Sequence, residues 1–326
     1  MEKSLRKDAN INSGLLLGFS VITFIIGQLA ILAIYKIYGI TEDNRNTPDG
    51  YHAMIVVQIV YNIIKYVIFL PSLILIARKS GQGIGNSLKM SFCKPQVKTG
   101  KIVKWIFIGI FITYFTSGMG ALLISAIQKA AGVTFTESNS NTDGSAFGGI
   151  AIAIMLIFMA PILEEVIFRG VFLRNLEKYG SFLAVIYSAV MFALWHTNYA
   201  QIPLTLGAGI CFSFLMAKTR SIFPSIILHM CINFFATFRS LFPYDPVNGF
   251  GSGFNPSAIY LILFGMIVTG LILLIITLIK SRDDFKLENN CKELTASRKF
   301  IGLWLAPLTV ITVVYFIGIT IHGALR

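Results

Sequence analysis

The sequence predicts an all-α, polytopic membrane protein of about eight to nine transmembrane helices, with a cytoplasmic N-terminus and a four-helix core that carries its polar motifs. Composition is the first reason, because 55% of the 326 residues are hydrophobic and only 13% are charged. An ordinary soluble domain has a smaller hydrophobic fraction and about 25% charged residues. The second reason is that several apolar runs reach the roughly 20 residues that a helix needs to cross a bilayer. The third is that basic connections alternate with connections that carry few basic residues.

Six apolar runs are long enough to span, and three shorter runs lie between the fourth and the fifth of them. The long runs fall at about 11–35, 53–77, 102–127, 148–173, 257–280 and 300–322, and the short ones at about 182–196, 203–217 and 221–239. We expect the short runs to cross a thinned or protein-shielded region, with one pair partly re-entrant. The runs group into helices one to three (1–147), a core of helices four to seven (148–240) and helices eight and nine (241–326).

Positive charge predicts the orientation, since lysine and arginine are retained on the cytoplasmic side. The basic connections are the N-terminus, the stretches 78–104 and 280–299, and two short links at 174–178 and 218–220. We therefore expect the N-terminus inside and the C-terminus outside. The formal net charge of +12 then reports topology and an attraction to anionic lipids, which we expect as partners in place of nucleic acid.

Several other features have plainer interpretations. The first apolar run is too long for a removed signal peptide and lacks its cleavage pattern, so we expect it to remain as a helix. The four cysteines lie in cytoplasmic loops or inside helices and form no disulfide framework. Gly251-Ser252-Gly253 is expected to be a flexible turn. Lys65 is a charge inside the second run, and we expect it either to contact the polar site or to pair or snorkel.

Three polar motifs interrupt the core runs. They are Glu164-Glu165-Val-Ile-Phe-Arg169, Phe192-Ala-Leu-Trp-His196 and His229-Met-Cys-Ile-Asn233. A charged residue at the centre of a membrane helix costs about 2.5 to 3.5 kcal/mol on insertion scales, so the glutamate pair needs compensation. Intramembrane ionisable groups are by default candidates for a functional site.

Spacing and depth indicate that the motifs meet. Glu165 and Arg169 are four residues apart and predict an ion pair, which leaves Glu164 about 100° away to face another neighbour. His229 and Asn233 share one helix face for the same reason. At about 1.5 Å of rise per residue, Glu164, His196, His229 and Asn233 all fall within about 9 Å in depth.

The three motifs, in this order across neighbouring helices, resemble those of the CPBP intramembrane proteases. This family contains the type II CAAX prenyl endopeptidases and the bacterial Abi proteins of bacteriocin processing and self-immunity. The resemblance covers about 150–240. It implies a helical membrane fold and an endopeptidase of membrane-associated, possibly lipidated, peptides or proteins, in a bacterial cell membrane.

The resemblance also implies roles for single residues. Glu164 and His196 would activate a water molecule, and His229 and Asn233 would stabilise the oxyanion. Glu165, Arg169 and Phe192 would support them, with Phe192 packed beside the site. We expect no cofactor; were zinc bound, its ligands would be Glu164, His196 and His229.

Two other classes of function remain open on the sequence. In one, the motifs survive as structure in a non-proteolytic scaffold or bacteriocin-immunity protein. In the other, glutamate and histidine form the proton relay of a transporter. Against the transporter, the sequence has no duplicated halves and no paired broken helices.

Overall fold

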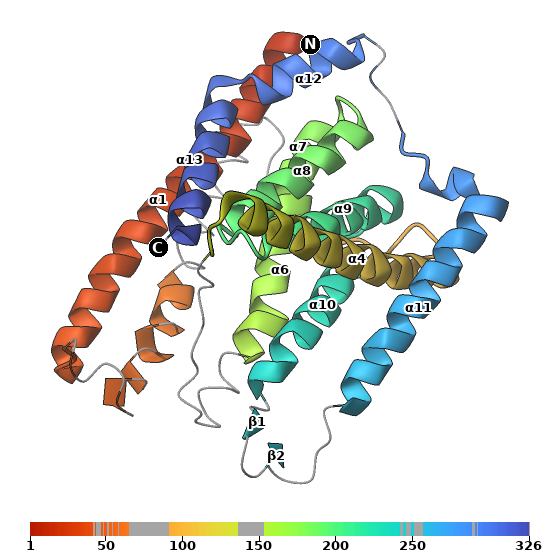
Figure 1. Cartoon of the computed structure of the whole chain (residues 1–326). Helices are drawn as coiled ribbons and strands as arrows, with labels where there is room; N and C mark the ends of the chain where they lie inside the picture. The colour runs from red at the N-terminus through yellow and green to blue at the C-terminus, as the bar shows by residue number, and fades with distance from the viewer. Residues whose placement is uncertain are drawn as a thin grey trace.

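Figure 1 shows the computed structural model of the chain, and the five longest stretches that it describes are 1–41, 91–135, 153–241, 257–288 and 293–325. It also describes single positions and short stretches at 43, 47, 49–50, 52–53, 55–57, 59–64, 244–245, 249–250 and 291. Lys65 and the turn 251–253 lie outside the described residues.

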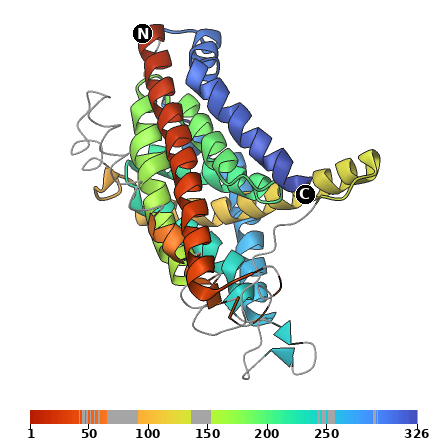
Figure 2. The same ribbon diagram turned by 90° about the vertical axis from the view of Figure 1, so that its left-hand side faces the viewer.

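The described chain is helical apart from one antiparallel pair of two-residue strands, β1 (Tyr244–Asp245) and β2 (Gly249–Phe250). The N-terminus and this strand pair lie at opposite ends of the molecule in both views (Figures 1 and 2). The helices are α1 (Glu2–Tyr38), α4 (Thr99–Ala131), α6 (Ala160–Glu165), α7 (Arg174–Glu177), α8 (Ser181–Trp195), α9 (Ile202–Thr219), α10 (Phe223–Leu241), α11 (Ser257–Lys280), α12 (Ala296–Trp304) and α13 (Pro307–Ala324), with π-helices η1 (Met155–Met159) and η2 (Val166–Leu173) and a 3₁₀ turn η3 (Arg282–Phe285).

Five helices of the described part are long and apolar enough to cross a membrane: α1, α4, α9, α11 and α13. Shorter apolar helices are α8, the first part of α10 and residues Ile55–Ile64. The predicted runs at 182–196, 203–217, 221–239 and 257–280 correspond to α8, α9, α10 and α11 within about two residues. The all-α, membrane-spanning fold class is confirmed.

The last predicted span is wrong as a single helix. Residues 300–322 belong to two helices, α12 and α13, separated at Leu305 and Ala306. Pro307 opens α13, and Ala306 before it has the extended conformation that a following proline favours (φ −64°, ψ 130°). The proline therefore breaks the apolar run into a short helix and a span.

Helix α9 lies at the centre of the bundle. Of its most apolar 18-residue window 61% is buried, whereas the share is 11% in α11, which presents mostly apolar side chains on the surface. Glycines allow this packing: a Cβ on Gly209 of α9 would meet the Ala189 backbone of α8 at 3.1 Å. Close approach at small residues is the usual way that membrane helices associate. The expectation that short core runs are shielded by protein is met in α8 and α9.

Ion pairs join all five basic connections at one end of the molecule. Lys178 binds Asp8 of α1 at 2.7 Å, and Arg220 bridges Glu177 and Glu288 at 2.7 and 2.9 Å. Lys101 and Lys104, at the start of α4, each bind Asp284 at 2.7 Å. The loops that the charge pattern assigns to the cytoplasm are thus on the same side of the bundle. That this side is cytoplasmic stays a prediction.

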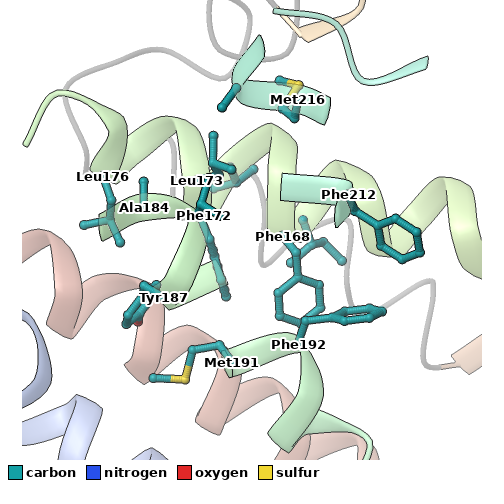
Figure 3. Packing of buried hydrophobic residues seen from close by; sticks show 14 of the residues in the cluster. Phe168, Phe172, Leu173, Leu176, Ala184, Tyr187, Met191, Phe192, Phe212 and Met216 are labelled. Atoms are coloured by element: carbon teal, nitrogen blue, oxygen red, sulfur yellow. The ribbon is translucent and has the colours of Figure 1, made fainter. Parts of the chain in front are cut away.

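Buried apolar side chains, several of them aromatic, pack together in the core (Figure 3). Phe168 of η2 packs edge-on against Phe172 and Phe192, with ring centroids 5.5 and 5.2 Å apart. Phe212 of α9 also packs edge-on against Phe192, with ring centroids 6.0 Å apart. The core therefore holds η2, α8 and α9 together where the motifs occur.

Candidate active site

The segment that carries the two glutamates is not a regular α-helix. Residues 155–177 run from a π-helix through the short α6 into a second, longer π-helix and then into α7. Glu164 and Glu165 are the last residues of α6, and Arg169 lies inside η2. π-Helical stretches are rare and frequently occur at functional sites, where the wider turn redirects side chains.

The ion pair predicted between Glu165 and Arg169 is confirmed. Arg169 Nη1 donates to Glu165 Oε1 at 2.8 Å, and both side chains are fully buried. The same guanidinium donates to the Gly209 carbonyl at 3.1 Å and to Ser213 Oγ at 3.3 Å, both on α9. Its central carbon lies 4.5 Å from the Phe192 ring centroid and 5.0 Å from that of Phe212. Hydrogen bonds and aromatic faces together compensate the burial of this cation.

His229 of α10 lies between the two glutamates. Its Nδ1 is 3.0 Å from Glu165 Oε1, a hydrogen bond, and its Nε2 is 3.8 Å from Glu164 Oε2. The second distance is too long for a direct hydrogen bond, but a single water can reach both atoms at ordinary hydrogen-bond length. Glu164 and His229 are 7% and 3% exposed, so both side chains lie within the protein. The imidazole also stacks on Phe212, with ring centroids 4.5 Å apart.

His196 follows the last residue of α8, and its tautomer can be read from its contact. Its Nδ1 lies 2.8 Å from the carbonyl oxygen of Phe192. A carbonyl only accepts, so Nδ1 carries the proton and Nε2 is the acceptor in the neutral ring. Thr197, the next residue, has a φ of +50°, which is unusual for a β-branched residue and ends the helix abruptly.

Phe192 connects the two histidines. It is 1% exposed, and its ring centroid lies 4.7 Å from that of His196 and 5.5 Å from that of His229. Both imidazoles therefore lie around one phenyl ring. This is the position beside the site that the sequence predicts for Phe192.

Asn233 also faces the glutamate segment, as its spacing from His229 requires. Its Nδ2 donates to the carbonyl oxygen of Leu156 in η1 at 2.7 Å. Because that oxygen can only accept, the atom facing it is the amide nitrogen. The amide has a second N–H, so this contact uses half of its donor capacity.

The residues named as zinc ligands do not gather as a set. Among the described residues, no three His, Cys, Asp or Glu side chains form a group that could hold a metal ion. Glu164 and His229 offer two donors, whereas catalytic zinc takes three protein ligands. The described side chains therefore do not fit the zinc site that the sequence would allow.

Sequence reasoning missed the contributions of α9 and η1. Gly209, Phe212 and Ser213 all contact Arg169 or His229, although none belongs to a polar motif. The run Gly207-Ala208-Gly209 was a usable signal, because small residues in a membrane helix mark close packing. No sequence signal marked Leu156, because only its backbone carbonyl takes part in the contact with Asn233.

These features define a multi-pass integral membrane protein with buried carboxylate and imidazole groups and a half-buried amide at one place in its core. The family model of the Rce1-like type II CAAX prenyl endopeptidases matches residues 146–235, which include all three motifs. Over this region the chain is similar to the CPBP-family proteases, and the family model and the relatives together support an intramembrane protease activity.

Two curated relatives agree with this. The chain is 27% identical to "Putative membrane peptidase YdiL" of Bacillus subtilis over 232 residues, 69% of this chain and 89% of the relative. It is also 27% identical to "Membrane-embedded CAAX protease MroQ" of Staphylococcus aureus over 234 residues, 68% of this chain and 87% of that relative. No solved structure matches the chain. Relatives from two bacteria are consistent with a bacterial membrane protein.

Proposed function

We propose that this protease hydrolyses a peptide bond of a membrane-associated peptide or protein with Glu164 as the general base. The observation that carries the proposal is that the two carboxylates have different partners. Glu165 is committed to Arg169 and to His229 Nδ1. Glu164 has its oxygen 3.8 Å from His229 Nε2, a separation that a single water can bridge. A carboxylate so placed can take a proton from that water as it attacks a carbonyl.

His196 is the proposed partner of Glu164 in ordering and activating the water. Support comes from its tautomer, because a ring that donates from Nδ1 to Phe192 O offers Nε2 as an acceptor. Phe192 makes T-shaped contacts with the rings of both histidines, which keeps this part of the site apolar. An apolar wall strengthens the electrostatic interactions that the reaction uses.

His229 and Asn233 are the proposed oxyanion donors. They are one turn apart on the same face of α10. When protonated, His229 carries an N–H on Nε2 as well as the one that Glu165 accepts, and Asn233 has one N–H beyond that given to Leu156. One oxyanion donor contributes about 2.7 to 4 kcal/mol to lowering the barrier, or about 10² to 10³ in kcat.

The substrate is proposed to be a hydrophobic, membrane-associated chain, lipidated or plain. One relative is named a CAAX protease and the matching family model describes prenyl endopeptidases, so prenylated peptides belong among the candidates. Anionic lipids are proposed partners of the basic end, where Lys101 is half exposed.

The test is cleavage of quenched fluorescent peptides by the purified full-length protein in liposomes. The peptides are hydrophobic sequences with and without a prenyl group, and each is measured with and without a strong zinc chelator. Glu164→Gln should reduce kcat by at least about 10³-fold and leave the folded protein intact. Glu177→Gln is the matched control, since Glu177 is as buried as Glu164 (7%) but lies at the end of the bundle where ion pairs join the basic connections. It should lower stability without abolishing cleavage.

Each outcome has a defined meaning. Cleavage that needs Glu164 and survives the chelator supports the metal-free mechanism proposed here. Loss of cleavage with the chelator and its rescue by zinc would replace that mechanism with a metalloenzyme. A Glu164→Gln protein that cleaves like the wild type would refute the role of Glu164.

A further inference from the structure

Pro161 leaves one backbone carbonyl of η1, that of Leu156, without a hydrogen-bond donor from its own helix. In η1 the hydrogen bonds run from residue i+5 to residue i, and the amide of Ala160 accordingly donates to the Met155 carbonyl. The next amide along the chain, which would donate to the Leu156 carbonyl, belongs to Pro161. Proline has no N–H. The Leu156 carbonyl therefore has no intrahelical donor at the position where the helix would supply one.

Asn233 supplies the missing donor from another helix. Its Nδ2 reaches the Leu156 carbonyl at 2.7 Å, a short hydrogen bond. A backbone carbonyl that is partly shielded from water loses free energy when it has no donor, so the contact is favourable for η1 as well as for Asn233. One turn earlier on α10, His229 makes the parallel contact to Glu165. Helix α10 is thus fixed to the glutamate segment at two points, and one of them exists because residue 161 is a proline.

We infer that Pro161 is a positioning residue for Asn233. By withholding an N–H it presents the Leu156 carbonyl to the amide of Asn233, which fixes the rotamer of that side chain and aims its second N–H. The inference rests on the proposed role of Asn233 as an oxyanion donor. It adds a requirement that the motif itself does not contain, because the acceptor that orients Asn233 is made by a residue three positions before Glu164.

The test is Pro161→Ala in the full-length protein. Alanine restores an N–H that can bind the Leu156 carbonyl, which then competes with Asn233. We expect kcat to fall about 10-fold with KM within about 2-fold of the wild type, because the amide is still present but no longer held. Thermal stability should be equal or higher, since alanine favours a helix interior. Pro307→Ala is the control: it removes a helix-starting proline from α13 and should leave kcat unchanged.

A double variant separates positioning from a general effect on the fold. In the Asn233→Ala background, which should by itself lower kcat about 10² to 10³-fold, Pro161→Ala should cause no further loss. The inference is overturned if Pro161→Ala keeps the wild-type kcat, or if its effect multiplies fully with that of Asn233→Ala. If Asn233→Ala alone keeps the wild-type kcat, the oxyanion role and this inference both fail, while Glu164→Gln still decides the proposed mechanism of water activation.

Discussion

The ion pair between Glu165 and Arg169 gives the most quantitative prediction. Both side chains are fully buried, and the Glu165 oxygen that binds Arg169 also accepts from His229. Removing one partner of a buried pair leaves an uncompensated charge and typically costs about 3 to 5 kcal/mol. We therefore expect Glu165→Gln and Arg169→Met each to lower the free energy of unfolding by about that amount.

The double variant is the informative measurement. It removes both charges, the new glutamine side chain can still accept from His229, and a methionine fits the aromatic surroundings formed by Phe192 and Phe212. Two independent losses would add up to about 6 to 10 kcal/mol, whereas replacing a buried pair by neutral groups is often nearly neutral. We expect the double variant to be no less stable than either single variant.

The assay is equilibrium unfolding in mixed micelles by titration with a denaturing detergent, followed by tryptophan fluorescence. Ser213→Ala is the control, because it removes only the longest of the three hydrogen bonds described for Arg169, at 3.3 Å, and should cost at most about 1.5 kcal/mol. Additive effects in the double variant, or single losses below about 1 kcal/mol, would refute the view that these two charges compensate each other.

Three further predictions concern other parts of the fold. Gly270→Ala should lower the midpoint of thermal unfolding by several degrees, because its Cβ would overlap the Phe107 carbonyl of α4. Gly265→Ala on the same helix is the control, since its Cβ would meet nothing within 4 Å and the variant should be neutral. Equal effects of the two substitutions would contradict the proposed close packing. Hydrogen bonds from Lys101 and Lys104 hold the pKa of Asp284 below its ordinary value of 3.8, so this carboxylate stabilises the fold above that value and stops doing so as the pH falls through the lowered pKa. Wild type and Asp284→Asn should accordingly differ in melting temperature at about pH 7 and converge below pH 3.8, and a constant difference would exclude the ion pairs as its cause. Thr197→Gly should raise the melting temperature slightly, since a positive φ costs a β-branched residue about 1 to 3 kcal/mol; a lower value would show that the threonine side chain contributes more than the strain.

Most of the fold could be predicted from the sequence because the helices are bounded by local signals. The runs that became α8 to α11 begin at or next to Gly, Ser or Pro, and their predicted limits differ from the observed ones by about two residues. The break at Pro307 was equally local and could have been predicted from the proline alone. The two π-helices could not, because they depend on partners in other helices. Ser188 donates to the Phe168 carbonyl in η2, and Asn233 donates to the Leu156 carbonyl in η1.

The candidate site shows the same limit. Spacing alone predicts the pair of Glu165 with Arg169 and the shared face of His229 and Asn233, because both depend on one helix. Which glutamate faces which histidine depends on how α8 and α10 are rotated about their own axes. That rotation is set by packing on α9, where Phe212 stacks on His229 and Gly209 lets α8 approach. The sequence therefore predicts the members of the site better than their partners.

The contact of His229 with Glu165 explains why two adjacent glutamates are useful in this site. Arg169 neutralises the charge of the buried Glu165 carboxylate. Glu165 therefore adds little electrostatic repulsion at the adjacent Glu164. The same oxygen of Glu165 fixes His229 through Nδ1, which directs Nε2 toward Glu164. In the proposed mechanism Glu165 therefore acts through His229 and does not touch the substrate. Glu165→Gln retains an acceptor for Nδ1 and should retain part of the activity, whereas Glu165→Leu should lose the orientation of His229 and with it the proposed oxyanion contribution of about 10² to 10³ in kcat. Equal cleavage rates of the folded Gln and Leu variants would show that His229 is oriented by something other than Glu165.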